Sequence, residues 1–498
     1  MMSNIPVILD LQNLTYSGHQ AFEINLHNSC VLQIESIVRR LPNRRLVCRG
    51  IWNNQAVFAK IFIGNDAKKY ALRDKRGAEY LLQAAVLTPS LLYANVTQDG
   101  AAEVLIYQAI ENSENAEVLY LNQLNQAERY KTSTKIVQAV AGHHNVNLMQ
   151  TDLHLKNFLI KDSLTYTLDG DGVRRYKKLN KQQALKNLSV LLSKFDVLDM
   201  EGWYVNLLKA YAAIRVWEVI PDAATIKSLV NQYRKKVVSH YAENKVFRAC
   251  TDVRIDQQDN YFSAISTCFF LKNLPKSPQD CDALIASQLR IKSGNTCTVA
   301  LTKIDGIAVV IKRYNVKSFW HGVNRAMRQT RAAVSWGNAH RLKQLGVATA
   351  APIALIEERH FRFSHFGLKG KAYFLSEYLD APDVSEFFSK VADVASQEDA
   401  IANIARLFYR LYLLKISHGD MKANNVKMIH NMPYLIDLDS MKQHQITWIA
   451  LNAHVKDLRR FMQNWQEAPA LYNALIQALK AVYTDNQPLQ LAQLFKKL

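Results

Sequence analysis

Apolar runs of strand length alternate with longer helical patterns along the chain, and the order of these elements occurs twice. Residues 56–62 and 307–312 are strand-like apolar runs that carry a lysine near their end. Residues 158–160 and 426–429 are shorter apolar runs, each followed by turn residues and a second short run. The amphipathic period of residues 401–411 predicts a helix before the second of these pairs. The pattern predicts two copies of one unit that mixes helices and strands.

A set of polar residues with constant spacing accompanies each copy. In both copies an aspartate is followed by an asparagine five residues later and by another aspartate seventeen residues later. A strand lysine precedes the first aspartate by 92 residues in one copy and by 108 in the other. The two sets are Lys60, Asp152, Asn157 and Asp169, and Lys312, Asp420, Asn425 and Asp437. A lone Asp and Asn at this spacing marks only a turn, whereas its repetition with an upstream lysine indicates shared chemistry.

The duplication and the length set the expected domain organisation. A chain of 498 residues is longer than one domain usually is, and 49% apolar residues are enough to build more than one core. We expect an α+β fold with a first domain at residues 1–255 and a second at residues 286–498. Residues 256–285 are expected to be a linker or lead-in segment, because Pro275 and Pro278 lie there among few large apolar residues.

The charge balance favours an anionic partner. Lys and Arg number 62 against 43 Asp and Glu, a formal net charge of +19. No helix-turn-helix, zinc or RNP-type signature accompanies this excess, so no nucleic acid is expected as a partner. Basic residues and Phe319, Trp320 and Trp336 concentrate between Gly306 and Glu357, which suits peripheral contact with an anionic membrane or a phosphorylated glycolipid. A solvated basic face is the alternative.

Cysteine usage and hydropathy indicate a reducing compartment. Six cysteines are scattered without a Cys-x-x-Cys pair, which excludes a zinc ribbon and argues against a disulfide scaffold. Cys48 and Cys297 are expected to be core residues. No secretory signal is visible, and no window approaches the roughly 18 apolar residues of a membrane span. We expect a cytoplasmic protein, with attachment to a membrane surface left open.

The repeated residues are those that phosphoryl transfer from a nucleotide requires. A strand lysine can hold the α- and β-phosphates, and a loop aspartate can orient an attacking hydroxyl and accept its proton. An asparagine and a second aspartate offer the hard oxygen ligands that Mg²⁺ prefers. The sequence therefore predicts phosphotransfer that uses ATP and Mg²⁺.

Four stretches resemble a known family. The motifs HGDMKANN and LIDLD resemble the catalytic and metal loops of the protein-kinase-like superfamily. More narrowly, residues 45–62, 151–160, 339–357 and 418–441 resemble the bacterial lipopolysaccharide kinase family, which phosphorylates heptose or Kdo sugars of the lipopolysaccharide core. The resemblance implies two tandem protein-kinase-like domains, each with a small β-rich N-lobe and a helical C-lobe.

Position by position, the resemblance implies a role for each repeated residue. Asp152 and Asp420 would be the catalytic bases. The metal ligands would be Asn157, Asp169, Asn425 and Asp437, and the residues that bind ATP phosphates would be Lys60, Lys312 and Lys422. His154 stands where the second copy has Lys422, and both a substrate role and a packed loop residue are open for it. Asp171 and Asp439 stand where the family's kinases often have glycine, and they would add a metal contact.

The two copies depart from the kinase pattern in different ways. Active kinases pair the strand lysine with a glutamate on the next helix, and Glu79 is placed to do so in the first copy, which adds it to the ATP-binding set. The second copy has no acid between Asp305 and Glu357, so this partner is missing. The glycine-rich phosphate loop is weak in both copies, because residues 41–45 contain no glycine and residues 292–296 contain one.

The sequence and the resemblance together predict a kinase that phosphorylates a sugar hydroxyl of lipopolysaccharide core, or another anionic glycolipid, at the cytoplasmic face of the inner membrane. The first alternative is another kinase class, because the first loop also resembles that of aminoglycoside and choline phosphotransferases; a protein kinase belongs to the same alternative. The second alternative is a pseudokinase scaffold in envelope assembly, since a kinase fold does not by itself imply catalysis.

Overall fold

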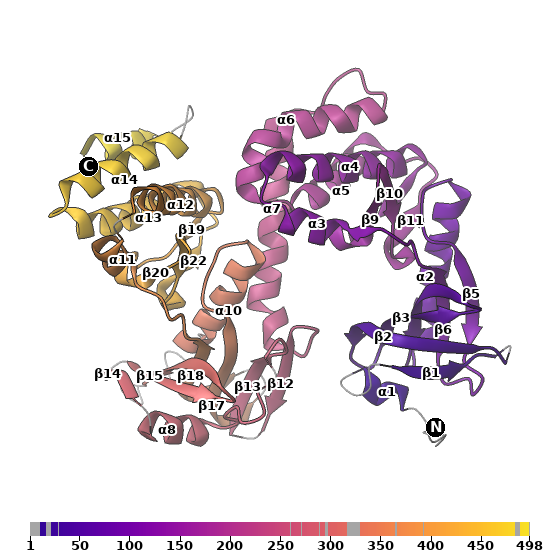
Figure 1. Cartoon of the computed structure of the whole chain (residues 1–498), viewed down its shortest axis with the longest axis horizontal. Coiled ribbons are helices and arrows are strands. Elements are labelled where there is room, and N and C mark those ends of the chain that lie inside the picture. The colour runs from indigo at the N-terminus through magenta and orange to yellow at the C-terminus, as the bar shows by residue number, and fades with distance from the viewer. Residues whose placement is uncertain are drawn as a thin grey trace. The chain divides into compact units, whose positions relative to one another are not determined.

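The chain folds as two compact units, Met1–Arg234 and Lys235–Leu498 (Figure 1). The computed structural model describes residues 10–15, 21–27, 29–258, 260–269, 271–287, 289–293, 297–315, 329–363, 366–391, 393–483 and 489–497. Within these residues both units contain an antiparallel sheet, a helix that packs on it and a group of helices further along the chain.

The sheet of the first unit has six strands in the order β1-β2-β3-β4-β6-β5, and every neighbouring pair is antiparallel. Its elements are α1 (Leu11–Leu14), β1 (Phe22–Asn25), β2 (Val31–Leu41), β3 (Arg45–Trp52), β4 (Gln55–Phe62), α2 (Ala67–Gln83), β5 (Leu91–Val96) and β6 (Glu103–Gln108). Alternation along β4 buries Val57, Ala59 and Ile61 in the sheet core, so Lys60 lies on the opposite face.

Helix α2 touches the loop that carries Asp169 through two glycines. A Cβ atom on Gly77 would lie 1.8 Å from the carbonyl oxygen of Gly170, and one on Gly170 would lie 2.2 Å from that of Asp74. Only glycine at both positions permits this approach of backbone to backbone. The contact fixes α2 beside the end of β10 and places its inner face next to Lys60.

The remaining elements of the first unit form a helical core around the hairpin β9/β10. They are β7 (Glu114–Asn115), α3 (Ala116–Asn122), α4 (Gln126–Asn145), β8 (Leu148–Gln150), η1 (Leu155–Asn157), β9 (Phe158–Lys161), β10 (Leu164–Thr167), η2 (Gly170–Gly172), β11 (Val173–Arg175), α5 (Lys181–Leu192), α6 (Val197–Ile214) and α7 (Ala223–Glu243). Apolar side chains of α4, α5 and α6 and of the loop before β9 make one cluster, which holds the hairpin rigidly. Helix α7 continues into the second unit.

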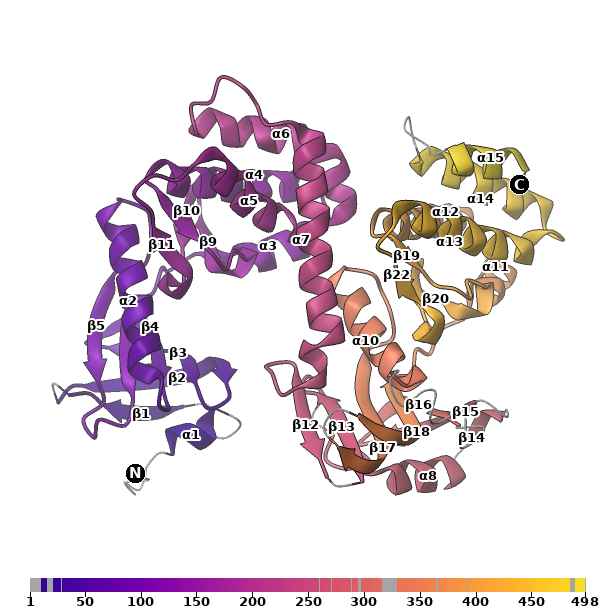
Figure 2. The same ribbon diagram turned by 180° about the vertical axis from the view of Figure 1, so that it is seen from behind.

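The sheet of the second unit has seven antiparallel strands in the order β12-β13-β17-β18-β16-β15-β14 (Figure 2). The elements of this part are η3 (Lys245–Phe247), β12 (Val253–Gln257), β13 (Tyr261–Ser266), α8 (Pro278–Ser287), β14 (Leu289–Ser293), β15 (Cys297–Ile304), β16 (Ile307–Tyr314), α10 (Arg331–Gln344), β17 (Pro352–Phe363) and β18 (Phe366–Glu377). Trp336, Ala332 and Ala333 of α10 pack on this sheet in a buried cluster.

The helical part of the second unit surrounds the hairpin β20/β21. Its elements are α11 (Val384–Lys390), α12 (Val394–Leu413), β19 (Ile416–Ser417), η4 (Ala423–Asn425), β20 (Val426–Ile429), β21 (Met432–Leu435), η5 (Leu438–Ser440), β22 (Lys442–Gln443), α13 (Thr447–Met462), η6 (Gln463–Trp465), α14 (Pro469–Val482) and α15 (Leu489–Lys497). Asp393 caps α12 by accepting from the Ser396 N–H. Helix α13 buries His454, Val455 and Leu458, among others.

The division between the units differs from the sequence expectation. The contacts separate after Arg234, not after residue 255, and the segment 256–285 is part of the second unit rather than a linker. Strand β13 lies in the seven-stranded sheet with every residue buried, and Pro278 is the first residue of α8. Proline is tolerated at the first position of a helix, so it was no sign of a linker there.

Candidate active sites

In both units the loop that carries the first aspartate is closed by a hydrogen bond from the asparagine side chain. Asn157 Nδ2 donates to the carbonyl oxygen of Asp152 at 2.8 Å, and Asn425 Nδ2 donates to that of Asp420 at 2.8 Å. Each asparagine is buried and ends a single turn of 3₁₀ helix, η1 or η4. This turn explains the spacing of five residues, because it returns the asparagine side chain to the aspartate backbone.

The second aspartate of each copy follows a hairpin that leads back to the asparagine. The residue before Asp169 donates its backbone N–H to the carbonyl oxygen of Asn157 at 2.7 Å, and the residue before Asp437 does the same to Asn425 at 3.0 Å. Asp169 and Asp437 both have left-handed backbone, with φ of 67° and 62°. Aspartate tolerates this region better than most residues. The structure thus brings the predicted Asp, Asn and Asp together in each unit.

The residue two positions before the first aspartate makes an equivalent hydrogen bond in both units, with a glutamine side chain in one and a histidine ring in the other. Gln150 Nε2 donates to the carbonyl oxygen of Leu168 at 2.8 Å, and His418 Nε2 lies 2.9 Å from the carbonyl oxygen of Ile436. Both side chains connect the loop of the first aspartate to the residue before the second. The first copy has Gln150 where the second has His418, and this link is made in both.

Two carboxylates hold Lys60 in the first unit. Its Nζ lies 2.6 Å from Asp74 Oδ2 and 2.9 Å from Asp169 Oδ1. Burial acts to lower the pKa of Lys60, but the two carboxylates outweigh it and raise that pKa. Burial likewise acts to raise the pKa of Asp169, yet Lys60 and Arg45 hold it well below the usual range. Asp169 is therefore ionised, as a ligand for Mg²⁺ must be.

Asp74, not Glu79, is the helix partner of Lys60, which corrects the sequence expectation. Asp74 is fully buried on the apolar face of α2, whereas the Glu79 side chain is 46% exposed and lies 3.9 Å from Lys75. Five residues of an α-helix turn about 500°, so the two acids point about 140° apart around the axis. Only Asp74 faces the strand that carries the lysine.

In the second unit the loop after the hairpin supplies both acids around Lys312. Its Nζ contacts Asp437 Oδ1 and lies 3.3 Å from Asp439 Oδ2. Burial acts to lower the pKa of Lys312, but Tyr314, Asp437 and Asp439 together raise it. Helix α10 contains no acid, and Asp439 takes the place that Asp74 has in the first unit.

The acid two residues after the second aspartate pairs with an arginine of the neighbouring helix in both units. Arg73 of α2 contacts Asp171, and Arg331 of α10 lies 2.7 Å from Asp439. We expected Asp171 and Asp439 to add a metal contact, but each is engaged by an arginine. Their shared role is to fasten the helix beside the sheet to the loop that carries Asp169 or Asp437.

Asp152 and Asp420 lie at the open side of their loops. The Asp420 carboxylate is 39% exposed, and it lies 3.1 Å from Lys422 Nζ and 4.0 Å from Arg460 Nε. Burial acts to raise the pKa of Asp420, but Lys422 and its other neighbours lower it, so the carboxylate is ionised and can accept a proton. Asp152 is exposed, and its charge opposes the effect of burial on Lys194, whose pKa is lowered.

Lys422 and His154 occupy corresponding positions but differ in charge. The Nδ1 atom of His154 lies 3.2 Å from Glu117 Oε1. Burial, with Lys156 and other cations adding to it, lowers the pKa of His154 to about 3. His154 is therefore neutral at neutral pH and does not bring the positive charge that Lys422 brings to the second unit.

The donor set of each loop fits Mg²⁺. Each asparagine uses its amide nitrogen within the loop, which leaves its Oδ1 as a ligand, and Asp169 or Asp437 adds a carboxylate. Mg²⁺ that binds with a nucleotide takes one or two carboxylates and completes its shell with phosphate oxygens and water. The described residues contain no group of three or more His, Cys, Asp and Glu that could hold a metal. The donor set suits a metal that arrives with phosphates.

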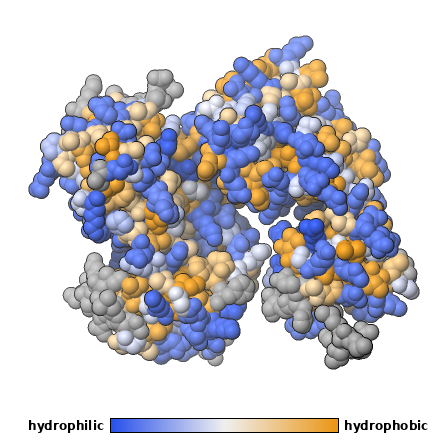
Figure 3. All heavy atoms as spheres, in the orientation of Figure 1, coloured by the Kyte–Doolittle hydropathy of each residue, from blue (hydrophilic) through white to orange (hydrophobic). Residues whose placement is uncertain are grey.

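The described part of the basic, aromatic stretch includes buried residues. Residues 316–328, with Phe319 and Trp320, lie outside the described residues. Trp336 is fully buried, and its Nε1 donates to the carbonyl oxygen of Val246 at 3.0 Å, so it does not face a bilayer. None of the described helices is long and apolar enough to cross a membrane. On the face drawn in Figure 3, hydrophobic and hydrophilic residues intermingle across the surface.

Two side chains that support the sites were not predicted. Arg45, at the start of β3, is buried 3.7 Å from Asp74 and 4.0 Å from Asp169, where it adds a second cation beside Lys60. Asp457 of α13 accepts from the backbone N–H of His418 at 2.6 Å and of Gly419 at 3.0 Å. Residues 294–296, the second phosphate loop, lie outside the described residues.

The family match lies within the second unit. Residues 286–483 match the family described as "Lipopolysaccharide kinase (Kdo/WaaP) family", which is a family of kinases. Among solved structures, "WaaP in complex with acyl carrier protein" is 16% identical, and the match covers 44% of this chain and 90% of that chain with a TM-score of 0.30. No curated protein matches the chain.

Proposed function

We propose that the second unit transfers the γ-phosphoryl group of ATP, with Mg²⁺, to a sugar hydroxyl of lipopolysaccharide core, a heptose or Kdo. The observation that carries this proposal is that the segment matched by the lipopolysaccharide kinase family contains Lys312 in contact with Asp437, next to the loop of Asp420 and Asn425. These are the residue types that phosphoryl transfer needs, in one place.

The site residues of the second unit divide the steps of this reaction among them. Asp420 orients the sugar hydroxyl and takes its proton as the oxygen bonds to the γ-phosphorus and the bond to the β,γ-bridging oxygen breaks, which releases ADP. Lys312 and Lys422 hold phosphate oxygens. Asn425 and Asp437 would hold Mg²⁺, which would neutralise charge on the phosphates. Asp439 and Arg331 position Lys312 and α10.

We extend the proposal to the first unit as a second kinase-like domain, so that the chain has two in tandem. Asp152 would be its base, Asn157 and Asp169 its metal ligands, and Lys60 its phosphate-binding cation. The supporting observation is that the hydrogen bonds between these loops are the same as in the second unit. A unit that binds nucleotide without turnover is the second candidate here, because Arg45 lies between Asp74 and Asp169 close to Lys60.

The acceptor and the location rest on the family and on charge. The net charge of +19 favours an acceptor that carries phosphate or Kdo carboxylates and favours an anionic leaflet. We therefore propose that the protein acts at the cytoplasmic face of the inner membrane. Its acceptor is presented there by the membrane, and the protein itself attaches peripherally.

Transfer of label from [γ-³²P]ATP to purified core oligosaccharide tests this function. We expect labelling that depends on Mg²⁺ and falls by about 10²–10⁴-fold in Asp420→Asn, because the base is lost. Asp399→Asn is the matched control, since it removes an exposed acid of α12 outside the site. Asp152→Asn, and the double variant that also carries Asp420→Asn, show which unit is responsible for the turnover. Label on aminoglycoside, choline or protein, with none on core sugar, would replace the proposed acceptor, and an unaffected double variant would refute both bases.

A further inference from the structure

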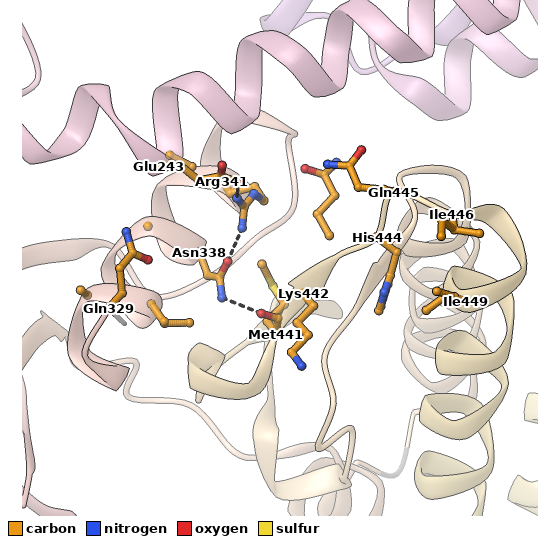
Figure 4. Close-up of a pocket in the computed structure, with 15 residues that line it drawn as sticks. Glu243, Gln329, Asn338, Arg341, Met441, Lys442, His444, Gln445, Ile446 and Ile449 are labelled. Carbon is orange, nitrogen blue, oxygen red and sulfur yellow. Dashed lines mark hydrogen bonds and ion pairs between the residues drawn. The ribbon is translucent and has the colours of Figure 1, made fainter. Parts of the chain in front are cut away.

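A pocket of about 470 Å³ lies in the second unit beside α10, away from the residues proposed for phosphoryl transfer (Figure 4). Three segments form its walls: the end of α7, the face of α10 with Val334, Asn338 and Arg341, and residues 441–449. Neither Lys312 nor Asp420, Asn425 or Asp437 belongs to its lining. The pocket is therefore a place where a ligand separate from the nucleotide can bind.

One deeply buried polar residue of the pocket is Arg341, which has an N–H group without a partner among the described residues. Arg341 is 7% exposed; its two terminal nitrogens donate to Asn338 Oδ1 and Glu243 Oε1, both at 2.5 Å. Its Nε is buried without a hydrogen-bond partner among the described residues. A buried, unpaired N–H of this kind is costly, so an acceptor that reaches it gains a charge-assisted hydrogen bond.

The rest of the lining favours an anion with an apolar body. Lys442 is exposed at the pocket and has no ion pair among the described residues, so it adds a second cation against the single acid Glu243. Val334, Ile446 and Ile449 supply apolar surface next to these charges. Figure 4 shows the Lys442 and His444 side chains on the wall opposite Arg341 and Glu243.

We propose that this pocket is a second ligand site of the chain, which binds a small organic phosphate or carboxylate with an apolar body through Arg341 and Lys442. Asn338 connects the pocket to the loop of residues 437–441, so a bound ligand affects the position of that loop. Asn338 Oδ1 accepts from Arg341, and its Nδ2 donates to the carbonyl oxygens of Leu438 and Met441 at 2.9 and 3.0 Å. These two carbonyls lie on either side of Asp439, one of the two acids that contact Lys312.

Titration of the full chain with phenyl phosphate, measured by isothermal calorimetry, tests the site. We expect binding that a non-hydrolysable ATP analogue with Mg²⁺ does not compete away. Arg341→Gln should weaken it at least tenfold, since it removes a charge-assisted hydrogen bond, and the exposed Lys442→Gln should weaken it about threefold. Val334→Phe should abolish binding by filling the pocket. Lys343→Gln, which removes an exposed charge from the same helix outside the pocket, is the matched control and should bind within twofold of the unchanged protein.

Further probes separate the parts of the proposal. Benzyl alcohol should not bind, and inorganic phosphate should bind more weakly than phenyl phosphate; equal affinity would overturn the apolar part, and binding of the alcohol would overturn the anionic part. Absence of binding or competition by the ATP analogue would overturn the site. Binding by Val334→Phe and Lys442→Gln that is as tight as that of the unchanged protein would also overturn it. These outcomes do not depend on turnover, so they remain distinct from failure of the proposed kinase activity.

Discussion

Lys60 and Asp74 form an ion pair with 2.6 Å between Nζ and Oδ2, and the carboxylate is completely buried. The hydroxyl of Tyr107 donates to the other carboxylate oxygen at 2.6 Å. The Lys60 ammonium and the Tyr107 hydroxyl therefore both bind the Asp74 carboxylate. Helix α2 is attached to the sheet through this residue, so the position of Lys60 and the position of the helix are coupled.

Asp74→Ala should destabilise the first unit by about 3–5 kcal/mol, because it leaves the Lys60 ammonium short of a buried partner. Glu79→Ala, in the same helix, should change the stability by no more than about 0.5 kcal/mol, as surface substitutions usually do. Differential scanning calorimetry of both variants measures the difference. Equal destabilisation by the two substitutions would contradict the pairing.

Local parts of the sites could be predicted from the sequence. The spacing of Asp152 and Asn157 follows from one 3₁₀ turn, and the short runs before Asp169 follow from a hairpin, so both are encoded by neighbouring residues. Asp74 also had a local signal, since it falls on the same helical face as the buried Ala71 and Ala78. The kinase pattern, which has a glutamate at this place, favoured Glu79 instead.

Other parts of the sites had no local signal. Asp439 meets Lys312 across 127 residues of chain, and Arg45 meets Asp169 across a similar stretch, so only the folded chain brings them together. The boundary was missed for another reason. Helix α7 runs without a break through position 234, so no change in composition marks the point where one unit ends.

Asp439→Asn should weaken the hold on Lys312 and Arg331 without removing a proposed metal ligand. We expect KM for ATP in the second unit to rise about three- to tenfold with kcat changed less, because a charged hydrogen bond is lost near the phosphate-binding lysine. Steady-state kinetics with core oligosaccharide measures both constants. A fall in kcat as large as that of Asp437→Asn would instead indicate that Asp439 contacts the metal.

His418→Gln should be tolerated, because Gln150 already makes the equivalent hydrogen bond in the first unit. We expect turnover by the second unit to remain within about threefold, whereas His418→Leu should lower it at least tenfold by leaving the Ile436 carbonyl unpaired. The pair of variants compares a side chain that donates with one that cannot. If glutamine is as harmful as leucine, the ring has a role beyond this hydrogen bond.

Acid pH should destabilise the first unit through His144. Burial lowers the pKa of His144 to about 4, and Tyr211 and Asn187 contact its ring nitrogens. Its pKa is lower in the folded chain than the 6.5 of the unfolded chain, so its contribution is fully present above pH 6.5 and is lost as the pH falls below it. At pH 5 this loss is about 2 kcal/mol. Urea unfolding at pH 7 and pH 5 should show a smaller difference in His144→Gln, and an unchanged difference would contradict the lowered pKa.

Asn338→Leu should uncouple α10 from the metal loop of the second unit. The substitution keeps the volume but leaves the carbonyls of Leu438 and Met441 and one Arg341 nitrogen without their partner, which should cost about 2–4 kcal/mol of stability. Asp437 directly precedes Leu438, so its position depends on the backbone that Asn338 holds. Mg²⁺-dependent turnover should therefore fall more than tenfold at temperatures where calorimetry shows that the variant is folded. Asn464→Leu, on the surface after α13, is the control and should keep turnover. Full turnover by folded Asn338→Leu would show that Asp437 is positioned without α10.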